Sequence, residues 1–89
     1  MRRAARVDAN QVALVAALRQ VGASVLVLGG TLDLAVGFRG QTTLMDAKNP
    51  FGKNRLTARQ AALLEEWRGG RIAFPRTVED ALRAIGALA

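Results

Sequence analysis

The sequence from Gly29 to Lys48, GGTLDLAVGFRGQTTLMDAK, has the pattern of two β-strands joined by a tight turn. From residue 32 to residue 37, apolar residues alternate with polar or small ones, which is the period-2 pattern of a strand with two different faces. Gly40 tolerates positive φ, so a turn is expected over residues 38–41. Alternation resumes over residues 42–48, and the stretch therefore predicts a β-hairpin.

A two-residue turn in this hairpin would place Asp33 directly opposite Asp46, whereas a three-residue turn with a bulge would shift the register by one. Facing side chains have Cβ atoms about 4.5–5.5 Å apart, and like charges at that spacing destabilise a sheet. A bound cation removes this penalty, and Mg²⁺ is typically held by one or two carboxylates together with water and phosphate oxygens. Lys48 would share the face of Asp46, where it can contact a phosphate or polarise the attacking water.

Composition adds weight to these three residues. Asp33 and Asp46 are the only carboxylates between Asp8 and Glu65, and only two of the 13 basic residues are lysines. A chain that otherwise uses arginine thus has the more compact lysine cation beside the aspartates. A simple salt bridge along one strand is the alternative explanation for the Asp-Ala-Lys triplet.

The motifs TLD and DAK, separated by 12 residues and followed by LTARQ and WRGG, resemble the PD-(D/E)xK nuclease superfamily. The pattern looks closest to the small virus-type replication-repair and Holliday-junction-resolvase-like members, and it covers nearly the whole chain. The resemblance implies an α/β, restriction-endonuclease-like fold with the order αβββαβα, in which helices flank a mixed central sheet. It further implies a metal-dependent DNA endonuclease, a homodimer acting on junction or branched DNA in phage or bacterial replication or repair.

The same resemblance assigns roles to individual residues. Asp33 and Asp46 would hold Mg²⁺ or Mn²⁺, with the Ala47 carbonyl as a third ligand. Lys48 would assist the attacking water. Gln60 would orient water or phosphate, with an ordinary surface glutamine as the equally weighted alternative. Candidate phosphate contacts outside this group are Arg39, Lys53, Arg55 and Arg59, and the basic residues 1–7 form either an arm on phosphates or a mobile terminus.

Two positions depart from the family pattern. The first helix often presents a glutamate to the active site, which we would expect near Ala13, where none exists. Either Asp8, Asn10 or Gln11 substitutes, or the metal site is leaner than usual. Leu32 occupies the usual proline position, with no loss of a metal ligand. Two other functions therefore stay open: a catalytically silent DNA-binding module and a protein-interaction factor of the same fold.

Local patterns predict the remaining elements. Apolar residues at helical spacing and capping residues indicate three helices, and the short run SVLVL reads as a buried strand. Thr57 is expected to cap the second helix, whose apolar residues, including Trp67, would face the sheet. The expected elements are helices over 9–20, 58–68 and 78–87, strands over 24–28 and 71–74, and the hairpin strands.

Length and composition exclude several classes. Eighty-nine residues make one domain, 1–89, and a net charge of +6 favours a polyanionic partner such as DNA. The absence of cysteine and histidine excludes disulfides, thiolate or imidazole metal sites, and histidine-based catalysis. The run VLVLGG lacks dinucleotide-binding spacing, so no organic cofactor is expected. No stretch approaches 18 apolar residues and no signal peptide is evident, so we expect a cytoplasmic protein without a membrane span.

Overall fold

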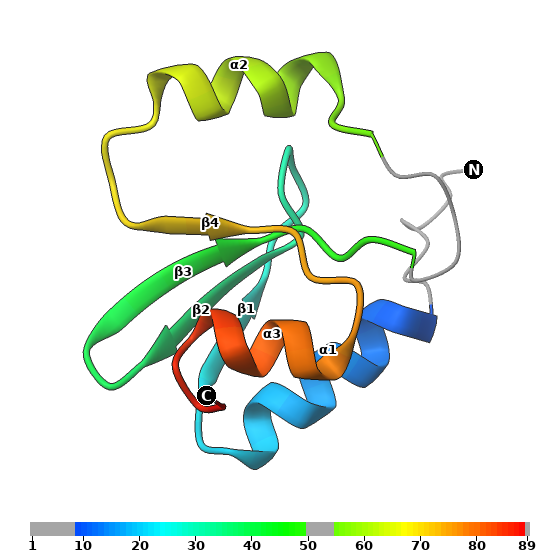
Figure 1. Cartoon of the computed structure of the whole chain (residues 1–89), viewed down its shortest axis with the longest axis vertical. Coiled ribbons are helices and arrows are strands. Elements are labelled where there is room, and N and C mark those ends of the chain that lie inside the picture. The colour runs from blue at the N-terminus through cyan, green and yellow to red at the C-terminus, as the bar shows by residue number, and fades with distance from the viewer. Residues whose placement is uncertain (1–8, 50–54, 89) are drawn as a thin grey trace.

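The computed structural model of the chain describes residues 9–49 and 55–88, which form a four-stranded mixed sheet with three helices (Figure 1). The α/β class and the predicted order αβββαβα are confirmed. In chain order the elements are α1 (Ala9–Gln20), β1 (Ser24–Val27), β2 (Leu34–Phe38), β3 (Gln41–Met45), α2 (Ala58–Glu66), β4 (Arg71–Ala73) and α3 (Val78–Ala84).

The hairpin of β2 and β3 is at the centre of the sheet, whose strand order is β1-β2-β3-β4. β1, β2 and β3 are antiparallel neighbours, and β4 pairs parallel to β3. Phe38 pairs with Gln41, so the turn consists of Arg39 and Gly40 alone, with φ of 52° and 79°. Positive φ at both positions is the type I′ turn that matches strand twist. The predicted two-residue turn and its register, through the pair Leu34–Met45, are confirmed.

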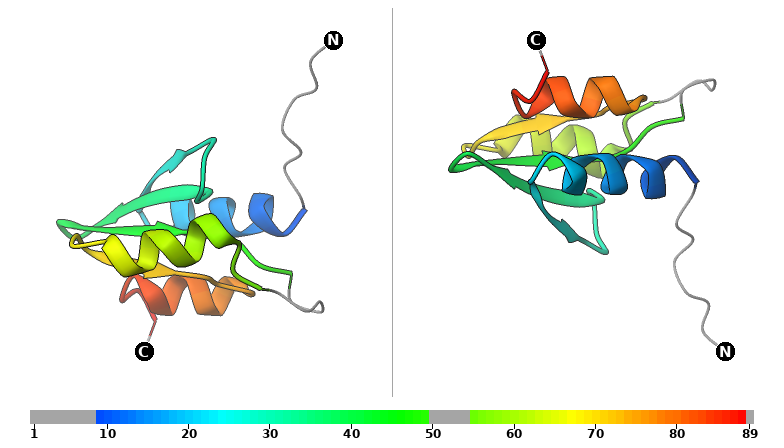
Figure 2. Two further views of the ribbon diagram at one scale, coloured as in Figure 1. Left: turned by 90° about the horizontal axis from the view of Figure 1, so that it is seen from above. Right: turned by 90° about the horizontal axis from the view of Figure 1, so that it is seen from below.

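The hydrophobic core lies on one face of the sheet, under α1 and α3. Figures 1 and 2 show these two helices on the same side, with α2 on the opposite side. Leu14 and Leu18 are one helical turn apart on α1, which places both against the sheet. The fully buried side chains are those of Leu14, Leu18, Leu34, Val36, Met45 and Ala81.

The interpretation of β1 as a buried strand is wrong. β1 is an edge strand, and its Leu26 side chain is 65% exposed, on the opposite face from the buried Val25. A continuous apolar run indicates burial on both faces only when layers cover both. Here α1 packs on one face of β1, while α2 leaves Leu26 largely uncovered.

The orientation predicted for α2 is also wrong in part. Leu63 is half-buried, but Ala61 and Leu64 are exposed, and Trp67 is 39% exposed with its indole Nε1 donating to the Gly70 carbonyl at 2.7 Å. The buried residue of α2 is instead Gln60, at the beginning of the helix. α2 therefore contacts the segments that flank the hairpin strands through a polar side chain near its N-terminus. Its apolar residues do not form a second buried core.

Within residues 9–49 and 55–88, no helix has both the length and the apolar character needed to cross a bilayer. The longest is α1, with 12 residues, and a span needs about 20.

A pair of leucine substitutions tests which face carries the core. Leu34→Ala, in the buried face of β2, should lower the free energy of unfolding by about 2–5 kcal/mol, because it leaves a cavity. Leu26→Ala, in the neighbouring strand, should change it by no more than about 0.5 kcal/mol, because that side chain is largely solvated. Urea denaturation followed by circular dichroism measures both, and equal losses would contradict the one-sided core.

Candidate functional site

The extended backbone continues beyond β3 through Lys48, and this extension builds the site. The N–H groups of Asp46 and Lys48 donate toward the β4 side, to Ala73 O at 3.1 Å and Pro75 O at 2.9 Å. Between them, the Ala47 N–H points the other way and donates to Asp33 Oδ2 at 3.0 Å. This alternation is that of a β-strand, so side chains 46 and 48 share a face, as predicted.

Asp33 lies one residue before β2, and its backbone is held on both sides. Its N–H donates to Met45 O at 3.0 Å, and its carbonyl accepts from Leu28 N–H at 2.6 Å. The Ala47 N–H donates to the Asp33 carboxylate instead of to a main-chain carbonyl. The carboxylate therefore lies beside the peptide bond between Asp46 and Ala47. The structure thus brings Asp33 and the Asp46–Lys48 segment together. The paired register ends at Leu34–Met45, so the direct opposition of Asp33 and Asp46 stays a prediction.

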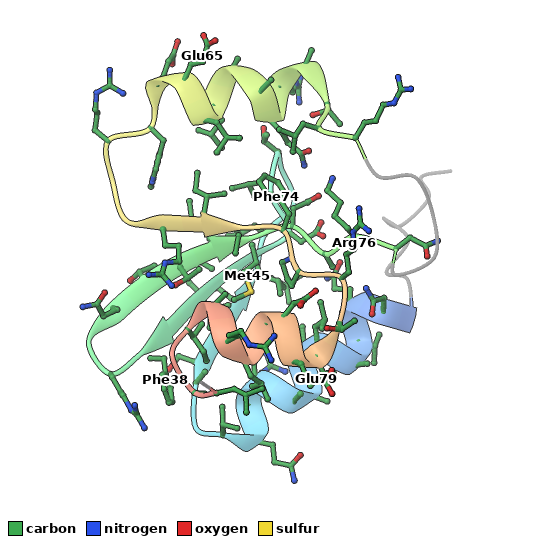
Figure 3. The ribbon with its side chains drawn as sticks, in the orientation of Figure 1. Phe38, Met45, Glu65, Phe74, Arg76 and Glu79 are labelled. Atoms are coloured by element: carbon green, nitrogen blue, oxygen red, sulfur yellow. The ribbon has the colours of Figure 1, made fainter. Side chains whose placement is uncertain are left out.

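Lys48 and Asp46 form an ion pair, with Nζ 3.0 Å from Oδ2, and both side chains are nearly buried at 13% and 12% exposure. The ammonium also lies 5.4 Å from the centroid of the Phe74 ring, on the side of the sheet that faces α2 (Figure 3). Met45 points to the opposite side, into the core (Figure 3). The salt bridge predicted as the alternative explanation of the Asp-Ala-Lys triplet is therefore present. It involves two of the residues of the candidate site.

Gln60 connects α2 to the lysine. Its Oε1 accepts from Lys48 Nζ and from the Thr57 N–H, each at 3.2 Å, while its Nε2 donates to Thr31 O at 3.0 Å. The Thr57 hydroxyl accepts in turn from the Gln60 N–H at 3.1 Å, which completes a capping box. Gln60 is 3% exposed, so it is no surface glutamine. Its fixed amide presents an oxygen to Lys48.

Asn10 is a site neighbour whose contacts the sequence did not predict. Its Nδ2 donates to Lys48 O at 2.6 Å and to Arg76 O at 3.2 Å. Ala13, near which the sequence resemblance predicts a glutamate, is exposed. The sequence identifies Asn10 only as one possible substitute for that acid. The sequence feature that could have predicted this contact is the position of Asn10 one helical turn before Leu14, which places a polar side chain on the buried stripe of α1.

Asp33 and Asp46 are the carboxylates of this site that could hold Mg²⁺ or Mn²⁺. The described residues contain no group of three or more His, Cys, Asp or Glu side chains placed to hold an ion. Mg²⁺, however, is commonly bound by one or two carboxylates with water and substrate oxygens. In an extended strand the N–H and C=O of one residue point to the same edge, so the Ala47 carbonyl lies on the Asp33 side.

The predicted phosphate contacts fall in different places. Arg55 and Arg59 are exposed and close to Gln60 in sequence. Arg59 lies in the first turn of α2, whereas Arg55 precedes the helix. Arg39 is in the hairpin turn, six residues from Asp33, which at about 3.3 Å per residue is about 20 Å away. The structure therefore separates Arg39 from the site. Lys53 and the basic segment 1–7 lie outside the described residues.

Comparison of the chain with protein-family models, curated proteins and solved structures finds no match. A fold by itself does not identify an activity, so function is inferred here from the geometry of the site. That geometry comprises two carboxylates beside one extended segment, a nearly buried lysine ion pair and a fixed glutamine.

The position of Lys48 can be tested without any assumed activity. Gln60→Leu should raise the reactivity of the Lys48 amine toward an acylating reagent severalfold, because it removes one of two polar partners and loosens α2. Thr57→Ala is the matched control, since it weakens the helix cap by about 1 kcal/mol but keeps the Gln60 side chain. Peptide mass spectrometry measures labelling of Lys48 relative to Lys53, and equal labelling in the two variants would show that Gln60 does not hold the lysine.

Proposed function

We propose that this chain is a metal-dependent DNA endonuclease whose active site comprises Asp33, Asp46 and Lys48. The observation that supports it most is their convergence on one short extended segment: Asp33 accepts from the N–H of Ala47, and Lys48 pairs with Asp46. The hairpin followed by a helix and a parallel fourth strand agrees with the PD-(D/E)xK core that the sequence resembles.

Each residue would have a distinct role in phosphodiester hydrolysis. Asp33 and Asp46 would hold Mg²⁺ or Mn²⁺, with the Ala47 carbonyl beside them. A bound divalent ion there would lower the pKa of its water and offset charge on the phosphate. Lys48 would contact the scissile phosphate or the attacking water with an ammonium that is already fixed in place. Gln60 would act on the reaction through Lys48, as a positioning residue, since its Oε1 accepts from Nζ.

The substrate proposal rests on charge. A net charge of +6 favours a polyanion, and Arg55 and Arg59 would contact phosphates. Lys53 stays a candidate phosphate contact from the sequence alone. Junction or branched DNA in phage or bacterial replication or repair is the substrate class that the family resemblance favours. Such DNA is met in the cytoplasm, which is where we place the protein.

A catalytically silent DNA-binding module is the second candidate, and a specific feature favours it. Lys48 is already neutralised by Asp46 at 3.0 Å, as in an ordinary structural salt bridge. In addition, α1 supplies no acid at Ala13, which is exposed. Such a module would bind DNA in a salt-dependent way and leave it uncut.

Cleavage of labelled duplex, flap and four-way-junction DNA, in Mg²⁺, Mn²⁺ or EDTA, tests the proposal. We expect cleavage of branched DNA with either metal and none in EDTA. Asp33→Asn keeps an acceptor for the Ala47 N–H but loses the charge, and Lys48→Ala removes the ammonium. Each should lower the rate by at least about 100-fold, because each removes charge stabilisation at the reacting phosphate.

Glu65→Ala and Arg83→Ala are the matched controls, since they remove exposed charges of the same signs from α2 and α3. They should cleave at the unmodified rate. Absence of cleavage by folded protein with either metal would refute the nuclease proposal, and salt-dependent binding alone would then select the silent module.

A homodimer is part of this proposal, because cutting two strands of a junction requires two sites and a two-fold dimer supplies them. One copy has a radius of gyration of only 12.9 Å for the Cα atoms. Light scattering coupled to gel filtration should give twice the chain mass of 9.5 kDa. A mass of 9.5 kDa at concentrations where junctions are cut would refute the dimer.

A further inference from the structure

A pocket of about 310 Å³ lies at the opposite end of the sheet from Asp33 and Asp46. It is formed where the hairpin turn, the beginning of β4 and the residues after α3 meet. Figure 3 shows Phe38 at this end of the hairpin, beside the C-terminal end of α3. Nothing in the proposed reaction uses this pocket.

The pocket is lined by two arginines, and no carboxylate of the described residues lines it. Arg71 donates from Nη1 to the carbonyl of Ala84 at 2.7 Å, and the Arg39 guanidinium lies 4.8 Å from the centroid of the Phe38 ring. Each guanidinium thus has a contact that restricts its rotamers and retains further N–H donors. Restricting a side chain before binding lowers the entropy lost on binding. Gln41 adds an amide to the same lining.

We propose that this pocket binds a backbone phosphate of DNA, as a second contact remote from the site of cleavage. The inference rests on the proposed function for the identity of the ligand, but not on catalysis. Two arginines without a lining carboxylate suit a phosphate diester, because their planar N–H groups match its oxygens. Arg39 lies about 20 Å from Asp33 along the strand, which corresponds to about six base pairs of duplex at about 3.4 Å per pair.

The surroundings favour a phosphate within a polymer over a free anion. Ala84 is the last residue of α3, and helix carbonyls at a C-terminus carry partial negative charge. Arg71 is partly occupied in offsetting that charge. A free anion would therefore gain little here, whereas a DNA phosphate already held near the pocket by other contacts binds at high effective concentration.

Salt-dependent DNA binding in EDTA tests the proposal without requiring cleavage. Arg39→Asn removes the guanidinium while keeping a residue that tolerates the positive φ of a type I′ turn. For a labelled 20-base-pair duplex, fluorescence anisotropy should show a slope of log K against log salt that is smaller by about 0.9, the value for one lost phosphate contact. Arg71→Gln should lower the slope similarly, with a thermal melt to verify folding.

Arg83→Gln is the matched control, because it removes the same charge from an exposed position of α3 outside the pocket lining. It should leave the slope unchanged, and equal slopes for Arg39→Asn and Arg83→Gln would overturn the proposal. Sodium phosphate, titrated at constant ionic strength without DNA, is the second arm. Saturation of the Arg39 and Gln41 amide signals in NMR spectra at low millimolar phosphate would overturn assignment to DNA, in favour of a free-anion site.

The two proposals can fail separately. A reduced salt dependence of DNA binding in Arg39→Asn, together with no cleavage by the unmodified protein, would refute the nuclease and support the remote phosphate contact. Cleavage with identical slopes in all variants would support the nuclease and refute the remote contact.

Discussion

Each polar group of Lys48 has a partner, and these partners belong to segments that are far apart in the sequence. Its N–H donates to Pro75 O, just before α3, and its carbonyl accepts from Asn10 of α1. Its ammonium lies between Asp46 and Gln60 of α2. A nearly buried charge is costly unless it is paired and hydrogen-bonded. Asp46 and Gln60 together offset the cost of burying the Lys48 ammonium. Lys48 thereby links the segment that follows β3 to α1, to α2 and to the residues that precede α3.

The two faces of the sheet have different physical tasks. α1 and α3 cover one face with close-packed apolar side chains, which supplies the core of a domain of this size. α2 covers the other face more loosely and contacts it through the buried Gln60, while Leu26 and Trp67 stay partly solvated. Asp46 and Lys48 belong to this second face. The side with the weaker apolar packing is thus the side on which a polar site can be built and reached.

The parts of the fold that short-range chemistry controls were predictable, and the parts that depend on layer order were not. Gly40 and strict alternation determine the hairpin, and the hairpin register brings Asp33 to the segment of Asp46 and Lys48. The apolar run of β1 does not reveal that its outer edge and one face lack a covering layer. The contact of Asn10 joins residues 38 positions apart, and no local pattern encodes such a separation.

The two ends of the sheet differ in charge, and this difference would give them different tasks in the proposed function. Two carboxylates and one ammonium give the group of Asp33, Asp46 and Lys48 a formal charge of −1, which repels a phosphate diester. A divalent ion would change that charge to +1 and make the same group attractive, so binding at this end would require metal. Arg39 and Arg71 supply positive charge at the other end of the sheet without a bound ion. If the proposed function is correct, DNA is held first at the arginine end, and its phosphate enters the carboxylate end only with the divalent ion that the proposed hydrolysis requires.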